Sequence, residues 1–322
     1  TMGADYDVEE IPANLVDEAQ EWRDKRTEFT PQFVKDAGAK GFMNKGKWSP
    51  YSDDPVFQKY YTKFVKALAK DFNDPSKVEF IDGFGLGKWG EYHTMIYSTG
   101  DDTPKKAVFD WVTDIYSQAF DKVPVVINYH RWIGAGKDWV DDEHFAADSE
   151  EMLEEAIKKG YSLRHDAFGM TTYYGSWERR FAKKYRNICP IIMEGGWIVK
   201  SHSYWQDPRG YRKDSHEDVR RGEFDDSKEA HVNMMDFRFG DTESWFKDAF
   251  DLVRRFLREG GYRLYPSEIS LPLEVSKKTT PTIKHCWNNM GWGYCPTNIP
   301  QWNQKYKVAF ALLDSETNEV RY

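Results

Sequence analysis

Short apolar runs alternate with amphipathic segments through the middle of the chain. Runs rich in β-branched and aromatic residues begin near positions 78, 123, 161, 188 and 232, and each is followed by a segment with helical spacing. Such alternation predicts a parallel sheet joined by right-handed helical crossovers. Each run ends in polar or aromatic residues, which favours a barrel whose loops gather on one face.

Capping residues mark where several helices should begin and end. An acid before proline, Asp53 or Asp54 followed by Pro55, predicts a capped helix that runs to about Phe72. Ser149 and the acids after it predict the start of another helix, which Gly160 closes. The remaining expected helices cover 13–26, 104–121, 176–185, 217–230 and 241–259, whereas Trp48-Ser49-Pro50-Tyr51 is expected to be a loop.

The predicted strands are too few for a complete barrel. A (β/α)8 barrel of the TIM type needs eight strands and typically about 250 residues. We therefore expect an α/β fold in which residues 1–260 form a TIM-type barrel with strands four to eight evident and the first strands missing from this chain. An open five-stranded α/β sheet, complete as it stands, is the alternative.

Helical spacing stops after Gly260-Gly261. Short β-type runs follow at 262–265, 269–275, 282–287 and 308–313, separated by Pro, Asn and Gly. They predict a small antiparallel, β-sandwich-like domain over 261–322. Cys286 and Cys295 lie close enough in sequence to form a disulfide, with two free thiols as the alternative, whereas Cys189 is expected to be buried.

Composition and charge narrow the range of partners. The net charge of −8 and the pI near 5.6 argue against a nucleic-acid partner. No apolar run is long enough to span a membrane. No signal peptide is present in this chain, but a disulfide would fit a secreted or periplasmic location. The aromatic share of 16 %, with 13 Trp, exceeds what a core needs, and surplus rings often line sugar sites, with a large aromatic core as the alternative.

Two of the apolar runs end in a glutamate beside glycine and tryptophan. The stretch Val78–His93 contains Glu91, and the run that begins near 188 ends in Glu194-Gly195-Gly196-Trp197. Paired carboxylates serve glycoside hydrolysis, in which one protonates the leaving oxygen and the other attacks the anomeric carbon. We expect Glu91 to be the general acid/base and Glu194 the nucleophile. Either glutamate could instead simply pair with a basic residue, such as Arg131, Arg164 or Arg238.

The same segments resemble a known family. The stretch from Trp48-Ser49-Pro50-Tyr51 to FIDGFGLGKWGEYH is similar to bacterial proteins related to clan A glycoside hydrolases, near the β-galactosidase-like enzymes. The resemblance implies an acid/base glutamate after strand four and a nucleophile after strand seven, which Glu91 and Glu194 match if the strand near 78 is the fourth. The later KHCWNNMGWGYCPTNI and YKVAFALLD resemble the small β domain that follows the barrel in some of these proteins. Clan A usually has Asn before the acid/base, and here Gly90 occupies that place.

Polar and aromatic residues near the strand ends complete the expected site. The candidates for substrate binding are Trp89, His93, Asn128, His130, His165, Tyr173, Trp197 and Arg238. Residues 85–90 match GxGxxG, but no helix opens after them, and no HExxH occurs, so neither a dinucleotide cofactor nor a catalytic metal is expected. The expected function is a retaining glycoside hydrolase that cleaves a β-linked oligo- or polysaccharide. A glycan-binding protein on a degenerate barrel and an inverting hydrolase are the alternatives.

Overall fold

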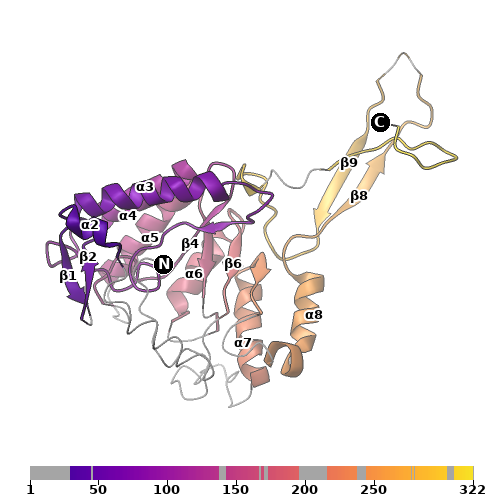
Figure 1. Cartoon of the computed structure of the whole chain (residues 1–322). Coiled ribbons are helices and arrows are strands. Elements are labelled where there is room, and N and C mark those ends of the chain that lie inside the picture. Colours follow the sequence, from indigo (N-terminus) through magenta and orange to yellow (C-terminus); the bar gives the residue numbers. More distant parts are fainter. Residues whose placement is uncertain are drawn as a thin grey trace.

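A curled, five-stranded parallel sheet forms the centre of the computed structural model (Figure 1). Its strands lie in chain order: β3 Ile81–Asp82, β4 Val125–Asn128, β5 Ser162–His165, β6 Ile191–Met193 and β7 Met234–Met235. The structure describes residues 30–44, 46–137, 143–166, 168–169, 173–195, 216–237, 244–276, 278, 280–302 and 308–321. All neighbouring strands of this sheet pair in parallel, which confirms the prediction from the alternating pattern.

Helices flank the sheet and connect its strands. They are α2 Gln32–Asp36, α3 Pro55–Phe72, α4 Lys105–Ala119, α5 Glu143–Lys158, α6 Ser176–Tyr185, α7 His216–Glu229 and α8 Phe250–Glu259. The start of α3 is as predicted, because the Asp54 carboxylate accepts hydrogen bonds from the N–H groups of Val56 and Phe57. In the described ranges, no helix combines the length and the apolarity that crossing a bilayer requires.

Two helix boundaries differ from the prediction for identifiable reasons. Helix α5 begins at Glu143, well before Ser149, whose hydroxyl accepts a hydrogen bond from the Ile133 N–H at 2.9 Å instead of capping the helix. The helix expected over 241–259 is divided into a π-helical turn, η4 Ser244–Asp248, and α8, with the break at Ala249. Residues 13–26 and 241–243 lie outside the described part of the chain.

The strands also differ from the prediction at several positions. The expected loop around Trp48 belongs to strand β2 Lys47–Pro50, which pairs antiparallel with β1 Gly41–Asn44. The first central strand is shorter than its apolar run, because pairing with β4 begins only at Ile81, whose N–H donates to the Pro124 carbonyl at 2.9 Å. A continuous apolar run therefore overstates the length of a paired strand.

Beyond α8, the chain forms an antiparallel hairpin of β8 Leu264–Ser270 and β9 Lys284–Asn289. The hairpin extends away from the main body (Figure 1), and every residue of β8 is exposed. In the described part of this region, the other pairing is a single bridge between Leu313 and Val320. Antiparallel pairing is thus observed, but a β-sandwich is not confirmed. The thiols of Cys286 and Cys295 are free, and Cys189 is buried as predicted.

A segment at residues 291–302 folds back from the hairpin onto the amino ends of the central strands. The Trp302 indole N–H donates to the Ser162 hydroxyl at 2.8 Å, and the Trp292 indole N–H donates to the Val232 carbonyl at 2.9 Å. We call this stretch the closing segment and the end of the sheet that it covers the amino edge. Residues expected in a separate β domain thus pack against the sheet.

Candidate functional site

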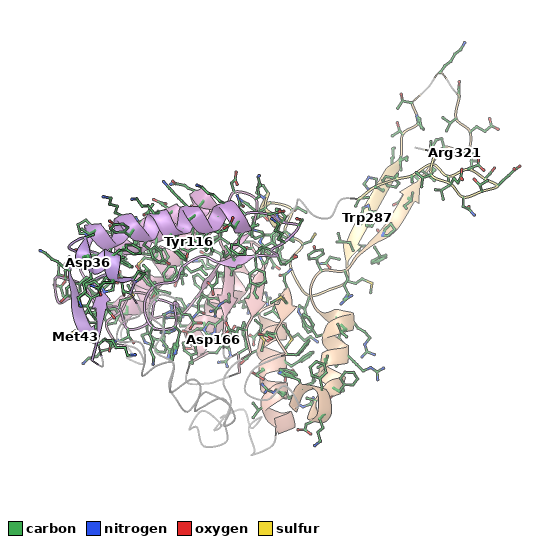
Figure 2. All side chains as sticks on the ribbon, in the orientation of Figure 1. Asp36, Met43, Tyr116, Asp166, Trp287 and Arg321 are labelled. Carbon is green, nitrogen blue, oxygen red and sulfur yellow. The ribbon has the colours of Figure 1, made fainter. Side chains whose placement is uncertain are left out.

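Polar residues stand where the central strands end. Asp82 ends β3, Asn128 ends β4, His165 ends β5, and Glu194 directly follows β6. Because the strands are parallel, these ends lie together at one end of the sheet, which we call the carboxyl edge. Figure 2 labels Asp166, the residue after β5, at this end of the main body. Parallel α/β proteins place their active sites at this edge, so it is the candidate site.

Arg164 in β5 holds three carboxylates together. Its Nε lies 2.7 Å from Asp82 Oδ2, its Nη2 lies 2.5 Å from Glu91 Oε1, and its Nη1 lies 2.9 Å from Glu194 Oε2. The first two contacts are hydrogen bonds, and the third is an ion pair without hydrogen-bond alignment. Burial alone would lower the pKa of the Arg164 guanidinium, but the surrounding carboxylates outweigh it and hold that pKa well above its usual value. The ion-pair alternative for both glutamates is therefore observed, with Arg164 as the partner.

The loop at residues 83–95 carries Glu91 to the carboxyl edge in a compact form. The Tyr92 N–H donates to the Leu86 carbonyl at 2.9 Å, which folds the loop back on itself. Gly87 and Gly90 adopt φ of 75° and 78°, a region that glycine enters without strain. A Cβ atom at position 90 would also lie only 3.3 Å from the Gly85 Cα, and this close approach gives a physical reason for glycine, rather than Asn, immediately before Glu91.

His130 supports the main chain of Glu91. Its Nδ1 accepts a hydrogen bond from the Trp132 N–H at 3.2 Å, so the ring proton resides on Nε2. That Nε2–H donates to the Glu91 carbonyl at 2.9 Å. Burial, followed by the neighbouring His93, keeps the pKa of His130 well below its usual value, so the ring is neutral. His130 therefore positions the loop from within the core.

Tyr173 links His93 to Asn128 beside the carboxylates. Its hydroxyl accepts a hydrogen bond from Asn128 Nδ2 at 3.3 Å and lies 2.6 Å from His93 Nε2. Having accepted the first bond, the hydroxyl is able to donate its own proton to the histidine. Burial, then the charges of Asp166 and Glu91, raise the pKa of Tyr173 well above its usual value, so it keeps that proton. These three side chains form a hydrogen-bonded row.

A buried ion pair fixes the position of Tyr173. The Arg131 guanidinium donates to both carboxylate oxygens of Glu178 in α6 at 2.9 Å and to the Tyr173 carbonyl at 3.2 Å. It also lies 3.8 Å from the ring of Trp132, which stacks on Tyr173 at an interplanar angle of 5°. Arg131 thus pairs with Glu178, and this pair supports the hydrogen-bonded row.

Three buried acceptors at the carboxyl edge have no hydrogen-bond partner among the described residues: Asn128 Oδ1, His165 Nε2 and Asp166 Oδ1. His165 donates its Nδ1 proton to the Asp166 carbonyl, which leaves Nε2 as an acceptor. Burial lowers the pKa of His165 to about 3, so the ring stays neutral. Unsatisfied buried acceptors are rare in folded proteins, and this group offers a place for ligand donors such as sugar hydroxyls.

Most of the candidates from the sequence come together at this edge. They are Glu91, His93, Asn128, His130, His165, Tyr173 and Glu194. Trp89 lies at the rim, 37 % exposed, with Lys88 Nζ 3.9 Å from its ring centroid. Trp197 and Arg238 lie outside the described residues. Asp166, which the sequence also suggests together with His165 at the end of its strand, lies at this edge as well, whereas the prediction missed Asp82 as a site residue, although it directly follows the apolar run that begins near 78.

Among the described residues, one group has spacing suited to a metal ion: Asp102, His144 and Asp148. Lys105 Nζ lies 2.7 Å from Asp102 and 2.6 Å from Asp148. The ammonium group already supplies a positive charge to these acids, so the group is an ion-pair cluster and gives no support for a metal.

Comparison with known proteins assigns no family to this arrangement. No protein-family model matches the chain, and no solved structure gives a significant match to it. Function must therefore be inferred from the chemistry of the carboxyl edge and from the resemblance in sequence.

Proposed function

We propose that the protein is a glycoside hydrolase that cleaves a β-linked glycan by a retaining double displacement. The observation that carries this proposal is the convergence of Glu91 and Glu194 on one buried guanidinium at the carboxyl edge. Because both carboxylates contact the same small planar group, the contacting oxygens lie within about 8 Å of each other. Glycosidases hold their two carboxyl groups about 5 Å apart for retention and roughly 6.5–9.5 Å apart for inversion. Such a pair is close enough to serve one anomeric carbon.

The order of the strands supports a TIM-type barrel as the framework of the site. β3 to β7 follow one another with a helix between successive strands, as strands four to eight of a (β/α)8 barrel do. On that numbering, Glu91 follows strand four and Glu194 follows strand seven. These are the positions that the resemblance to clan A glycoside hydrolases implies for the acid/base and the nucleophile.

The two glutamates suit their proposed roles unequally. The side chain of Glu194 is 28 % exposed, so substrate can reach it, and the contact with Arg164 favours the charged form that a nucleophile needs. Glu91 has a side chain only 9 % exposed and is bound by Arg164 at 2.5 Å. To act as the acid it would have to hold a proton and release this contact. The proton donor is therefore the role that the contacts of Glu91 support least.

The groups around the carboxylates suit a neutral sugar. Asn128 Oδ1 and His165 Nε2 offer acceptors to hydroxyl groups, and Trp89 exposes part of its ring at the rim, where a pyranose face could stack. Trp197 and Arg238 stay predicted contacts, and the secreted or periplasmic location stays a prediction. No cofactor is required by this chemistry.

The pairing with Arg164 also favours a second candidate, a glycan-binding protein without catalysis. Carboxylates that are neutralised by a buried guanidinium can serve the structure alone. In that case the unpartnered acceptors would bind sugar hydroxyls, and no bond would be cleaved.

A panel of aryl β-glycosides, followed by a glycan array, tests the proposal. We expect the wild-type protein to hydrolyse at least one glycoside with retention of anomeric configuration, followed by NMR. Glu194→Gln should lose about 10²–10⁴-fold in kcat, whereas Glu155→Gln, an exposed change on α5 next to Lys158, should not. Full turnover by Glu194→Gln would contradict the nucleophile, and an inverted product would indicate the inverting mechanism. Glycan binding without hydrolysis would indicate the binding protein.

A further inference from the structure

Four carboxylates gather around Arg164, and one of them has no share of its guanidinium. The three nitrogens of the group face Asp82, Glu91 and Glu194, one carboxylate each. Asp166, the fourth, has a buried Oδ1 without a hydrogen-bond partner among the described residues. His165 Nδ1 lies 3.7 Å from this oxygen and donates its proton elsewhere, to the Asp166 carbonyl. No cation among the described residues thus contacts the Asp166 carboxyl directly, and the charge of Arg164 only partly offsets the effects that raise the pKa of this group.

Asp166 is also more accessible than Glu91. Its side chain is 25 % exposed and that of Glu194 is 28 % exposed, against 9 % for Glu91. A group that exchanges a proton with substrate has to reach the glycosidic oxygen, within about 3 Å or through one water. By exposure, Asp166 and Glu194 are therefore the better pair for a substrate that enters from the solvent.

We propose that Asp166, and not Glu91, holds the exchangeable proton of this site and delivers it to the glycosidic oxygen. This inference rests on the proposed function and replaces one of its residue roles. A carboxyl among carboxylates is neutral when it has no cation of its own, as in other acid pairs that share a site. Consistent with this, burial, then the charges of Glu91 and Glu194, raise the pKa of Asp166 well above its usual value.

The step balances with the groups at the carboxyl edge. In the first half, a carboxylate oxygen of Glu194 bonds to the anomeric carbon as the bond from that carbon to the leaving oxygen breaks. The leaving oxygen takes the proton of Asp166 and departs as an alcohol. In the second half, Asp166 removes a proton from water, the water oxygen bonds to the anomeric carbon, and Glu194 is released. Glu91 keeps its contact with Arg164 throughout and takes no part in the transfer.

Infrared spectroscopy tests where the proton resides without any substrate. In protein labelled with ¹³C at the aspartate carboxyl groups, we expect a protonated-carboxyl carbonyl band at neutral pH that Asp166→Asn removes. Asp82→Asn is the matched control, because it removes a carboxylate from the same edge that is bound to Arg164, and it should keep the band. Absence of the band in the wild type, or its loss only in Asp82→Asn, would overturn the proposal.

The leaving group tests the role of that proton in the reaction. For substrates with a poor leaving group, Asp166→Asn should lose about 10²–10⁴-fold in kcat/KM. With a dinitrophenyl leaving group, which needs no acid, the same variant should stay within about tenfold of the wild type, because kcat/KM reports the first bond cleavage. If Glu91→Gln shows this dependence on the leaving group and Asp166→Asn does not, the acid is Glu91 and the inference is wrong. If the wild type cleaves no glycoside, the proposed function fails, and the infrared band still decides whether Asp166 holds a proton.

Discussion

The two ends of β5 have different surroundings, although Ser162 and Arg164 lie on the same side of the strand. At the amino edge, Ser162 accepts one hydrogen bond from the indole of Trp302, a contact between neutral groups. At the carboxyl edge, Arg164 faces three carboxylates within 2.9 Å. The contacts made by one strand therefore change from a hydrogen bond between neutral groups at one end to three ion pairs at the other.

The two edges of the sheet therefore differ in how well their polar groups are satisfied. At the amino edge, the closing segment satisfies strand-end groups such as the Val232 and Ile188 carbonyls, with Asn233 Oδ1 as an exception. At the carboxyl edge, acids outnumber the cation, and three buried acceptors lack partners among the described residues. Such groups cost stability unless a ligand satisfies them. The contrast is the reason for placing the proposed site at the carboxyl edge.

Removal of the Arg164 charge should have the largest effect on stability. Arg164→Met keeps much of the side-chain volume but leaves three carboxylates without their cation, and breaking a buried ion pair in this way costs about 3–5 kcal/mol. The loss should be measured by urea unfolding at neutral pH and again at acidic pH. As pH falls and the carboxylates bind protons, the repulsion between them disappears, so the difference from the wild type should shrink.

A second arginine provides the matched comparison. Arg179 in α6 binds Asp226 in α7, with its Nη2 3.0 Å from Asp226 Oδ2. Arg179→Met breaks the pair with Asp226 and should cost clearly less than Arg164→Met, which breaks contacts with three carboxylates. Equal losses in the two variants would mean that the three acids around Arg164 do not act together.

The order of the elements could be predicted because burial leaves a periodic pattern in the sequence. Strands covered on both faces are continuous apolar runs, as in the fully buried β4, and the cap at Asp54 predicted the first residue of α3. The limits of the strands could not be predicted, because pairing depends on the neighbour, as Ile81 and Pro124 show. The sequences of β8 and β9 have the pattern of β-strands, but this pattern does not show whether another element covers the strands.

That Glu91 and Glu194 lie near each other could be predicted, but their contacts could not. Glu91 and Glu194 follow apolar runs, and that signal is local. Which acids a buried arginine meets is decided by tertiary structure, since Arg164 reaches Glu91 across 73 positions and Asp82 across 82. The role of Ser149 was missed for the same reason, because its partner, Ile133, lies in another loop.

Substitutions of Trp302 test whether neutral packing at the amino edge contributes to stability and not to activity. Trp302→Ala removes a ring whose centroid lies 6.3 Å from that of Phe80, and it removes the hydrogen bond to Ser162. The free energy of unfolding should fall by about 3 kcal/mol. Trp302→Phe keeps most of the ring and should cost about 1 kcal/mol for the lost hydrogen bond. Both values should be measured by urea unfolding, together with glycoside turnover below the midpoint. A loss of turnover in the folded Trp302→Phe protein would show that the two edges are coupled.

The smallest effect is expected at the rim of the carboxyl edge, where Trp89 has a φ of 59°. A side chain in this left-handed region costs roughly 1–2 kcal/mol, but Asn tolerates it. Trp89→Asn relieves that strain but loses the cation–π contact with Lys88, which is worth about 0.5–1 kcal/mol at an exposed site. The free energy of unfolding should therefore stay the same or rise by about 0.5 kcal/mol. The affinity for sugar should fall, because the exposed ring is lost. Tyr92→Asn is the contrasting variant, because Tyr92 has a φ of 66° but a fully buried ring, and it should be strongly destabilising. Chemical denaturation and titration with a glycan ligand measure both quantities. A loss of more than about 1 kcal/mol in Trp89→Asn would show that the ring supports the loop and is not held strained for a ligand.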